Sequence, residues 1–574
     1  MVEVGDDRIP FAKFIPLIKK GDRFFELSDG TYFVIPYTWM TTYKQLSQFA
    51  VVEDESVQLR KSNFKVLEGI PTTKAITVTT KKTPEYTPSS SLKATLRPYQ
   101  LQGVQWLVDL YHKQLGGCLA DDMGLGKTLQ TIAFLNYTKE QLPPDETLTP
   151  IKLDLFDTPL EKKNYLRALL VMPSSLIFNW YQELKKFAPH LTIANYTGNK
   201  RKELTPYLNG YDIVLTTYHT ATRDLEQLKK IQFHCFVADE SQQLKNKDSK
   251  LFQALHSLDI PHKISLSGTP IENSLADLWS QMQFINPEVL GSYPFFKRYF
   301  QQPIEKLQDP ERTQELKTLL EPFILRRTKE QVAKDLPQLS EQIFYTEMLP
   351  KQEKLYEELK SAARNQLLHI GKTHQPVSKI NVINTLTKLR QLSNHPRLTE
   401  EGKELPSGKF QDVTAYLQTL LKASKKALVF SSFVQHLEYY TQWCDAQKIS
   451  YRLLTGQTKA TDRAKAVTDF QNNSEISLFF ISIKAGGTGL NLTSASYVIL
   501  LDPWWNPFVE KQAIARAHRI GQTDAVTVTK FITKNTVEEK IIQLQQRKKL
   551  LSDEIIAVDT IPELDQSILK DLLK

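Results

Sequence analysis

Leu119 to Ile132 reads LADDMGLGKTLQTI, a short apolar approach followed by a tight glycine loop and a Lys-Thr pair that opens a helical run. Gly124 and Gly126 allow the backbone to turn so that its N–H groups face phosphate oxygens. Lys127 can then reach the β and γ phosphates, and the hydroxyl of Thr128 can ligate Mg²⁺. The helix that follows adds its positive N-terminal end to the same anion. The stretch therefore predicts a site for the phosphates of a nucleotide.

One position of this glycine loop departs from the usual phosphate-binding pattern. Five residues before Gly126, where Gly or Ala is usual, the chain has Asp121. A turn before an ordinary helix is the alternative interpretation, because the short Gly-x-Gly-Lys-Thr core also arises by chance in long chains. The choice between the two interpretations depends on the rest of the chain.

The composition indicates a multidomain globular protein. The chain has 574 residues, of which 41% are hydrophobic, and its formal net charge is +9. A mild excess of positive charge suits a polyanionic partner without establishing one. Cys118, Cys235 and Cys444 lie far apart and share no metal-ligand spacing, which predicts small apolar core residues in a reducing compartment and no structural zinc.

The first residues, MVEVGDDRIPF, contain neither the basic start nor the apolar stretch of a signal sequence. No uninterrupted apolar run approaches the length of about 18 residues that a membrane-spanning helix needs. These patterns predict a protein without membrane contact, located in the cytoplasm or the nucleus.

Residues 1–90 alternate short aromatic segments with Asp-Gly and Gly-Asp turn signals and end in a polar stretch. The pattern predicts a small mixed or β-rich accessory module followed by a linker. Residues 96–107 (LRPYQLQGVQWL) then predict a helix with Gln100 near its start. The Gln100 amide offers a donor and an acceptor side by side, which matches an adenine edge, although an exposed Gln at a helix start is also common.

A second strong signal is HCFVADESQQLKN at residues 234–246, in which an apolar strand ends in Asp239 and Glu240. Doubly wound folds place their chemistry at the carboxyl ends of parallel strands. Asp239 can hold the Mg²⁺ shell there, and Glu240 can orient and deprotonate an attacking water. Residues 264–273 (ISLSGTPIEN) add a strand with a Ser-Gly-Thr corner suited to sensing the γ-phosphate. Two acids after a strand usually mark only a loop, but the phosphate cradle earlier in the chain favours a functional pair.

Hydroxyl-bearing corners and a glycine-rich corner follow several other predicted strands. Hydroxyls, lysines and backbone N–H groups at such corners can hold nucleic-acid phosphates without reading the base sequence. A plain turn is the alternative at each of them. The candidate contacts are Ser174, Ser175, Thr216, Thr217, Ser431, Ser432, Lys484, Gly486 and Thr488.

Taken in order, these motifs resemble those of the Swi/Snf-type (sucrose-nonfermenting) DNA translocases within the superfamily-two helicases. The similarity extends over about residues 96–545. It implies an α/β fold of two RecA-like lobes, each a doubly wound parallel sheet, with ATP and Mg²⁺ between the lobes and double-stranded DNA across their top. The box DESQ stands where DEAH or DEAQ is usual: Gln242 keeps the amide of the fourth position, and Ser241 differs at a position with no direct catalytic duty.

The resemblance also implies how the chain is divided. We expect the accessory module and linker at 1–90, the first lobe at 91–330 and the second lobe at 409–545. A helical linker with protrusions is expected at 331–408. The C-terminal residues 546–574 are expected to form a brace that returns to the first lobe.

Other positions of the resemblance leave alternatives open. Arg326, Arg327 and Lys329 are expected to touch DNA or the opposite lobe, or else to form an exposed charged face. The family uses the aromatic that matches Trp505 as a wedge against DNA, whereas a core anchor is the alternative. His395 is expected to be structural rather than catalytic.

Residues 512–522 (QAIARAHRIGQ) predict a helix on which Gln512, Arg516 and Arg519 share one face. Two guanidiniums on that face can reach across a cleft, as arginine fingers from a second lobe do toward ATP held by the first. Gln512 is then expected to bind the nucleotide. The expected catalytic residues are Lys127, Asp239, Glu240, Arg516 and Arg519.

Together these patterns predict an ATP-dependent, DNA-stimulated motor that moves on duplex DNA without separating its strands and remodels protein–DNA complexes. An RNA- or DNA-unwinding helicase and a nucleotide-gated DNA-binding scaffold with little turnover are the alternatives. The expected partners are double-stranded DNA of any sequence and a DNA-bound protein such as RNA polymerase or a chromatin protein. We expect a monomer of prokaryotic origin associated with the nucleoid; a nuclear location would follow otherwise.

Overall fold

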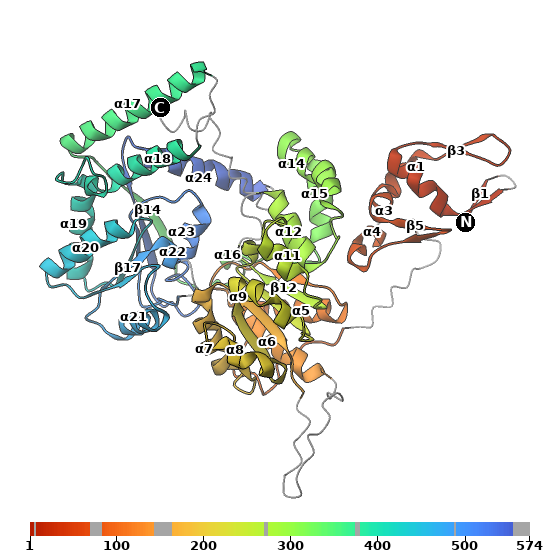
Figure 1. Cartoon of the computed structure of the whole chain (residues 1–574), viewed down its shortest axis with the longest axis horizontal. Coiled ribbons are helices and arrows are strands. Elements are labelled where there is room, and N and C mark those ends of the chain that lie inside the picture. The colour runs from red at the N-terminus through yellow and green to blue at the C-terminus, as the bar shows by residue number, and fades with distance from the viewer. Residues whose placement is uncertain are drawn as a thin grey trace, which may run out of the picture.

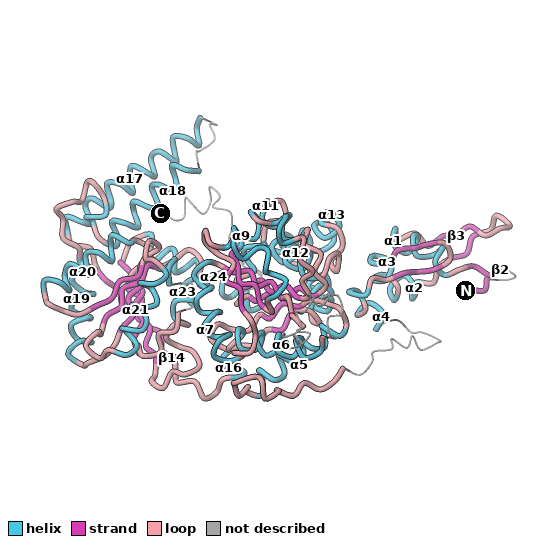
Figure 2. Tube along the Cα trace, turned by 60° about the horizontal axis from the view of Figure 1, so that its bottom comes forward, coloured by secondary structure: helices cyan, strands magenta, loops and turns pink. Residues whose placement is uncertain are grey.

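The computed structural model describes residues 1–4, 7–68, 70, 83–142, 164–268, 274–373, 379–486 and 490–554. Two α/β lobes, each built on a parallel sheet, lie side by side, and a small N-terminal module lies beyond the first lobe (Figure 1). The tube view shows the strands of the lobes as two separate groups, each surrounded by helices (Figure 2). The predicted α/β class with two doubly wound lobes is confirmed.

The first lobe is organised around a seven-stranded parallel sheet. Its central strands β8 and β11 are apolar over most of their length because helices cover both faces of the sheet. Leu169 and Val171 enter the core on one face, while Leu170 and Met172 enter the core on the other. The strand order is β13 (Ile324–Leu325), β7 (Gly117–Leu119), β12 (His262–Leu266), β11 (Cys235–Asp239), β8 (Ala168–Met172), β10 (Ile213–Thr217) and β9 (Ile193–Asn195).

Helices of two kinds belong to this lobe. Those that cover the sheet include α5 (Pro98–His112), α6 (Lys127–Gln141), α7 (Ile177–Phe187), α9 (Tyr218–Arg223), α11 (Lys250–His256) and α12 (Leu275–Ile285). Others extend from the lobe above the sheet in Figure 1: α14 (Gln302–Leu307) and α15 (Pro310–Leu320), which follow the short helix α13 (Tyr293–Phe296).

The second lobe is organised around a six-stranded parallel sheet. The order is β14 (Leu339–Thr346), β19 (Val526–Thr533), β18 (Tyr497–Leu500), β15 (Ala427–Ser431), β17 (Leu478–Ser482) and β16 (Tyr451–Leu454). Its helices include α19 (Gly408–Lys422), α20 (Val434–Ala446), α21 (Ala460–Asn472), α22 (Ile483–Gly486) and α23 (Pro507–Ile514). Because all strands of a lobe are parallel, their carboxyl ends meet at one edge of its sheet.

The segment predicted as a helical linker, 331–408, differs from the expectation. It contains the long helices α17 (Pro350–Thr373) and α18 (Lys379–Asn394), but it also contains β14. β14 pairs with β19 over its whole length, from Leu339 opposite Val526 to Thr346 opposite Thr533. The β-prone run IFYT finds hydrogen-bond partners at the sheet edge, so this part of the segment is an edge strand of the second lobe.

The N-terminal module is mixed, as the sequence predicts. Three antiparallel strand pairs, β1–β2, β3–β4 and β5–β6, alternate with short helices. The first two pairs surround a small core that contains Phe14 and Ile35, whereas Val52 and Val57 of the third pair pack against the core of the first lobe. The module contacts the first lobe, where Asn63 Nδ2 donates to the backbone O of Val289 at 2.8 Å. The pairs comprise β1 (Val2–Val4) and β2 (Asp7–Ile9), β3 (Phe24–Glu26) and β4 (Tyr32–Val34), and β5 (Val51–Glu53) and β6 (Ser56–Gln58).

The C-terminal helix α24 (Val537–Glu554) packs against α18 and β19 of the second lobe. The buried residues of α24, such as Val537 and Ile541, all precede residue 546, so the brace predicted for 546–574 onto the first lobe stays a prediction. Residues 555–574, the remainder of the predicted brace, lie outside the described residues. Over the described ranges, no helix is long and apolar enough to cross a membrane.

Candidate active site

The glycine loop lies between β7 and α6 and turns as the sequence predicts. Gly124 and Gly126 have φ angles of +89° and +79°, in the left-handed region that favours glycine. Space is restricted as well: a Cβ on Gly126 would lie 2.5 Å from Gln100 Nε2, and a Cβ on Gly124 would lie 2.7 Å from Arg519 Cβ. The second of these contacts joins the two lobes, so the loop directly faces the second lobe.

The two acids lie at the end of β11, beside the glycine loop. Asp239 is the last residue of the strand, and Glu240 follows with φ +51°, a left-handed backbone that is uncommon for such a side chain. Each oxygen of Asp239 accepts a hydrogen bond, Oδ2 from Trp180 Nε1 at 2.7 Å and Oδ1 from the backbone N of Glu240 at 2.9 Å. Burial and the neighbouring Glu240 carboxylate raise the pKa of Asp239 to about 6.

Glu240 is connected to the Ser-Gly-Thr corner through an amide. Gln242 Nε2 donates to Glu240 Oε2 at 2.6 Å, and Ser267 Oγ donates to Gln242 Oε1 at 3.3 Å. Ser241 is buried and donates to Gln281 Oε1 of α12 at 3.2 Å, so this departure from the family box is used in packing. The chain from Glu240 to Ser267 links the end of β11 to the end of β12.

The arginines of the second lobe lie beyond a helix that is shorter than the sequence predicts. α23 ends at Ile514, after which the backbone N–H of Arg516 bonds three residues back to Ala513 and tightens the chain. Arg516 and Arg519 therefore lie in turns, and both line the cavity between the lobes, whereas Gln512 does not. The prediction of one helical face carrying all three residues is wrong.

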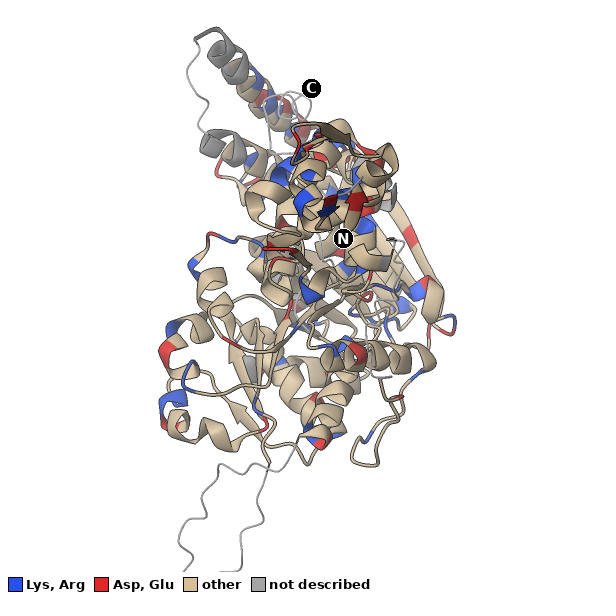
Figure 3. Cartoon of the chain, turned by 90° about the vertical axis from the view of Figure 1, so that its right-hand side faces the viewer, with Lys and Arg blue, Asp and Glu red and all other residues tan. Residues whose placement is uncertain are grey.

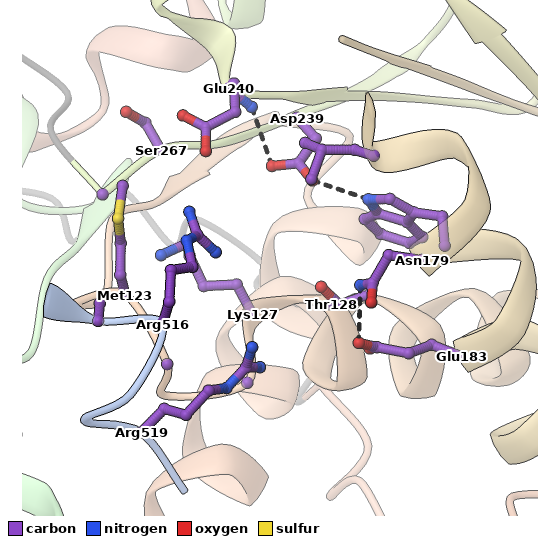
Figure 4. Close-up of a pocket in the computed structure, with 16 residues that line it drawn as sticks. Met123, Lys127, Thr128, Asn179, Glu183, Asp239, Glu240, Ser267, Arg516 and Arg519 are labelled. Atoms are coloured by element: carbon purple, nitrogen blue, oxygen red, sulfur yellow. Dashed lines mark hydrogen bonds between the residues drawn. The ribbon is translucent and has the colours of Figure 1, made fainter. Parts of the chain in front are cut away.

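These groups surround one cavity that is open to solvent. Figure 4 shows Arg516 and Arg519 pointing from the second lobe toward Lys127 and Thr128 of the first. The cavity is lined by Met123, Gly124, Gly126, Lys127, Thr128, Leu176, Asn179, Trp180, Glu183, Asp239, Glu240, Ser267, Gly268, Ala515, Arg516 and Arg519.

Cations of both lobes meet in this cavity. Burial lowers the pKa of Lys127, whose Nζ donates to the backbone O of Asp121 at 2.6 Å. Burial and the nearby Arg519 lower the pKa of Arg516 to about 10. Cations that are buried close together repel one another, so their arrangement favours a polyanionic ligand such as a triphosphate.

The oxygen ligands of the cavity suit Mg²⁺. Thr128 and Asp239 both line it, and the raised pKa of Asp239 indicates a buried carboxylate whose charge a cation would balance. No group of three or more His, Cys, Asp or Glu able to hold a metal occurs in the described part of the chain. A magnesium ion held by one or two protein oxygens and by substrate phosphates needs no such group.

Helix α7 contributes a wall of the cavity that the sequence reading did not foresee. Asn179, Trp180 and Glu183 all line it, and Asn179 Nδ2 donates to Glu183 Oε1 at 2.9 Å. Burial raises the pKa of Glu183, while the facing Arg519 opposes this effect. The sequence signal for this wall is the pair of polar residues one helical turn apart, Asn179 and Glu183.

Comparison with known proteins identifies the chain's family. Residues 99–398 match the model of the SNF2-related domain, and residues 408–521 match that of the helicase conserved C-terminal domain. The chain belongs to the SNF2 family of helicase-related ATPases.

Relatives of this SNF2 chain occur in bacteria and eukaryotes. YwqA of Bacillus subtilis is 36% identical over 503 residues, which are 85% of this chain and 52% of YwqA. The ISWI chromatin-remodeling complex ATPase ISW1 of Saccharomyces cerevisiae is 32% identical over 480 residues, 80% of this chain and 40% of ISW1. The chain thus spans about half the length, or less, of these curated relatives.

Among solved structures, the Sulfolobus solfataricus SWI2/SNF2 ATPase core in complex with dsDNA is 36% identical in sequence. The match covers 85% of this chain and 99% of that one, with a TM-score of 0.42.

The contacts of Asp121 explain why this residue stands where the phosphate-binding pattern usually has Gly or Ala. Its carboxylate is fully buried and accepts from Arg327 Nε at 2.9 Å, from Arg327 Nη2 at 2.5 Å and from Gln130 Nε2 at 3.1 Å. Arg327 Nη1 also donates to the backbone O of Tyr99. Asp121 therefore links the glycine loop to Arg327, two residues after the end of β13. Glycine or alanine at position 121 has no carboxylate and could not form this link.

The three basic residues after β13, Arg326, Arg327 and Lys329, lie in three different environments. Arg326 is exposed, and Arg327 is buried against Asp121, so the prediction that Arg327 touches DNA or the opposite lobe is wrong. Lys329 Nζ reaches the second lobe and donates to the backbone O of His518 at 2.6 Å. Its position agrees with the expected contact to the opposite lobe.

Gln100 differs from its predicted role. The side chain is 3% exposed; its Nε2 donates to the backbone O of Leu125 at 3.1 Å, and its Oε1 accepts from the backbone N of Arg97 at 3.0 Å. The amide thus holds the glycine loop against the start of α5, and the donor–acceptor pair expected to meet adenine is engaged within the protein.

The hydroxyls predicted to hold DNA phosphates are not equally accessible. Ser174 is exposed and Ser175 half-buried, directly after β8. Thr216 is buried and donates to the backbone O of Tyr196, while Thr217 accepts from the backbone N of Thr220 as the N-cap of α9. The structure therefore contradicts a phosphate contact by Thr216.

The corresponding serines of the second lobe are also engaged. Ser431 Oγ donates to Asp502 Oδ1 at 2.6 Å, and Ser432 Oγ also donates to the Asp502 carboxylate. The phosphate contact predicted for Ser431 is contradicted because this residue is buried against Asp502, whereas Ser432 is half-buried and its contact stays a prediction. Lys484 and Gly486 lie on α22, whereas Thr488 lies outside the described residues.

Two aromatic positions of the second lobe can be compared with their expectations. Trp505 is half-buried, packs beside the cluster around Tyr356, and has the guanidinium of Arg390 5.8 Å from its ring centroid. His395 packs edge-on against Phe410 and at a tilt against Tyr439, and burial lowers its pKa to about 4. This environment confirms that His395 is structural.

Proposed function

We propose that the chain hydrolyses ATP in the cavity between its lobes and uses the cycle to move along double-stranded DNA without separating the strands. The observation that carries the proposal is the composition of this cavity. One lobe supplies a phosphate loop and two acids, and the other supplies two arginines. A ligand that contacts both sets draws the lobes together, and its hydrolysis releases them.

Each residue of the first lobe has a role in this proposal. Lys127 and the N–H groups of the loop hold the β and γ phosphates, and Thr128 and Asp239 hold Mg²⁺. The metal, when bound, balances charge that develops on the phosphate oxygens. Glu240 orients the attacking water and accepts its proton, and Gln242 fixes the Glu240 carboxylate for that task.

Arg516 and Arg519 act on the same phosphates from the opposite side. Guanidiniums placed there stabilise the negative charge of the transition state. Phosphoryl transfer to water begins only when the lobes are close enough for both arginines to reach the phosphates. The short distance between Gly124 and Arg519 supports this arrangement, since nothing larger than glycine fits between the loop and the arginine backbone.

DNA as the polymer is supported by the net charge of +9 and by the relatives. One solved relative is described as a complex with dsDNA, and the name of ISW1 describes a chromatin-remodeling ATPase. In the view of Figure 3, Lys and Arg positions are interspersed with Asp and Glu, so the support that charge gives is the net positive excess alone. Exposed Ser174, half-buried Ser175 and Trp505 are the proposed DNA contacts.

Movement without unwinding is supported by the elements around the second-lobe arginines. Between β18 and β19 the described chain holds only the Trp504-Trp505 turn, α23 and the arginine turns. An element inserted between two DNA strands is usually a hairpin or an added domain, and neither occurs in this stretch. The protein moved from DNA by such a motor would be a DNA-bound one, such as RNA polymerase or a chromatin protein.

The test combines three measurements. ATP turnover is compared with duplex DNA, single-stranded DNA and RNA; the proposal expects the largest stimulation with duplex DNA. Displacement of a third strand from a triplex and strand release from a forked duplex are then compared on equal ends. Strand release from the fork at catalytic enzyme concentrations would favour an unwinding helicase, and negligible turnover on every polymer would favour a scaffold.

A further inference from the structure

Trp180 lies where the carboxylate of Asp239 meets α7. The side chain is 1% exposed, although tryptophan is large and usually retains some exposure. Its indole N–H is a donor without acceptor capacity, and it donates to Asp239 Oδ2 at 2.7 Å. Figure 4 shows the acceptor of this bond, Asp239, on the same side of the cavity as Asn179 and Glu183. The single polar atom of a buried core tryptophan is thus directed at one acid of the site.

The remaining contacts of Asp239 show how strongly its orientation is set. Its Oδ1 accepts from the backbone N of Glu240, and its own backbone O accepts from the Tyr218 hydroxyl at 2.8 Å. With one donor on each carboxylate oxygen, rotation of the carboxylate about its last bond would break both bonds. Only the donor on Oδ2 comes from a side chain, so it is the one that a substitution can remove.

We propose that Trp180 is a positioning residue for Mg²⁺ binding: its indole N–H holds the Asp239 carboxylate so that the free lone pairs face the ion held with the nucleotide. The inference rests on the proposed function, in which Asp239 and Thr128 hold Mg²⁺. Partners behind a metal ligand fix its direction, and their loss typically lowers metal affinity by about 10- to 100-fold. Trp180 never touches the substrate in this account, and its effect passes through Asp239.

The first test uses Trp180→Phe, which keeps an aromatic ring and removes the N–H. Trp279→Phe is the matched control, because Trp279 is also buried in the first lobe and its Nε1 donates at 3.0 Å to a backbone O, that of Gly291, away from the cavity. Free Mg²⁺ is titrated in two readouts: ATP turnover and binding of a fluorescent ADP analogue.

For Trp180→Phe, the Mg²⁺ concentration at half-maximal response should rise about 10- to 100-fold in both readouts, and turnover should recover at saturating Mg²⁺. Trp279→Phe should match the wild type. An unchanged half-maximal concentration in Trp180→Phe, or a loss of turnover that saturating Mg²⁺ does not restore, would overturn the inference. A wild type without Mg²⁺-dependent turnover would instead refute the proposed function, so the two failures can be told apart.

A second measurement is made on the wild-type protein and does not depend on the folding of Trp180→Phe. The wild-type protein, which contains seven tryptophans, is prepared with isotope-labelled indole nitrogens, and its indole N–H signals are followed by NMR. The signal of Trp180, assigned by substituting the other tryptophans one at a time, should shift when Mg²⁺ is added to the ADP-bound protein, while that of Trp279 stays in place. Equal or absent shifts of the two signals would contradict the proposed role.

Discussion

Replacement of Arg327 by Met should destabilise the first lobe more than any surface substitution nearby. The guanidinium makes two bonds to the fully buried Asp121 carboxylate, at 2.9 and 2.5 Å, one to Gln130 at 2.9 Å and one to the backbone of Tyr99. Met fills similar volume but leaves the carboxylate without its cation. Removing one partner of a buried pair costs about 3–5 kcal/mol, because the remaining charge stays buried and unpaired.

The magnitude can be expressed as a melting temperature. For a unit of the size of this lobe, about 1 kcal/mol corresponds to roughly 2–4 °C, so the first-lobe transition should fall by about 6–20 °C. Differential scanning calorimetry of the full chain measures this shift. Arg326→Met is the matched control, since Arg326 is the exposed neighbour, and a surface change of this kind is expected to cost at most about 0.5 kcal/mol.

A double variant separates the charge from the packing. When Asp121→Leu accompanies Arg327→Met, no unpaired charge remains, so much of the lost stability should return, as it does when a whole buried pair becomes apolar. If Arg327→Met melts at the same temperature as Arg326→Met, or if the double variant is less stable than Arg327→Met alone, the pair does not stabilise the lobe as argued.

Four further outcomes are expected. Lys127→Ala should abolish ATP turnover by removing the phosphate partner, as a phosphate-release assay would show. Glu240→Gln should bind ATP with near-normal affinity but hydrolyse it about 10²- to 10⁴-fold more slowly, and normal hydrolysis would exclude its role as base. Arg519→Ala should lower kcat, on the order of 10³-fold or more, far more than nucleotide affinity; the opposite pattern would reassign it. Burial lowers the pKa of His395 and His262 from 6.5 to about 4, so the unfolded state binds more protons than the folded state between these pH values. Urea titrations should therefore show a free energy of unfolding that is highest above pH 6.5 and falls as the pH drops to 4.

Several parts of the site follow from short stretches of sequence. The loop at Gly124 and Gly126 needs a backbone that only glycine adopts readily, and the following Lys127 lies next to it whatever the rest of the chain does. Asp239 and Glu240 end a short apolar run whose length and β-prone residues favour a buried strand, so their place at the sheet edge was predictable. Local backbone preferences and strand patterning determine these features.

Contacts between distant segments were decided by the tertiary structure. Asp121 and Arg327 are 206 residues apart, and no pattern near either one indicates the other. Thr216 and Ser431 looked like Ser174 in sequence, yet packing turned the first two toward protein acceptors. A side chain's partner depends on which elements the fold brings against it.

The same distinction applies to the two walls of the cavity. Arg516 and Arg519 were candidates because guanidiniums suit a phosphate site. The packing of the second lobe ends α23 at Ile514, and this end sets the direction of both side chains. From the sequence, Trp180 is expected to be a core residue. Only the packing of α7 in the first lobe places its indole N–H within hydrogen-bonding distance of Asp239. Sequence determined which chemical groups this protein has for a phosphate site; the tertiary structure decided which of them face one another, because hydrogen bonds and burial depend on distances that the chain order does not set.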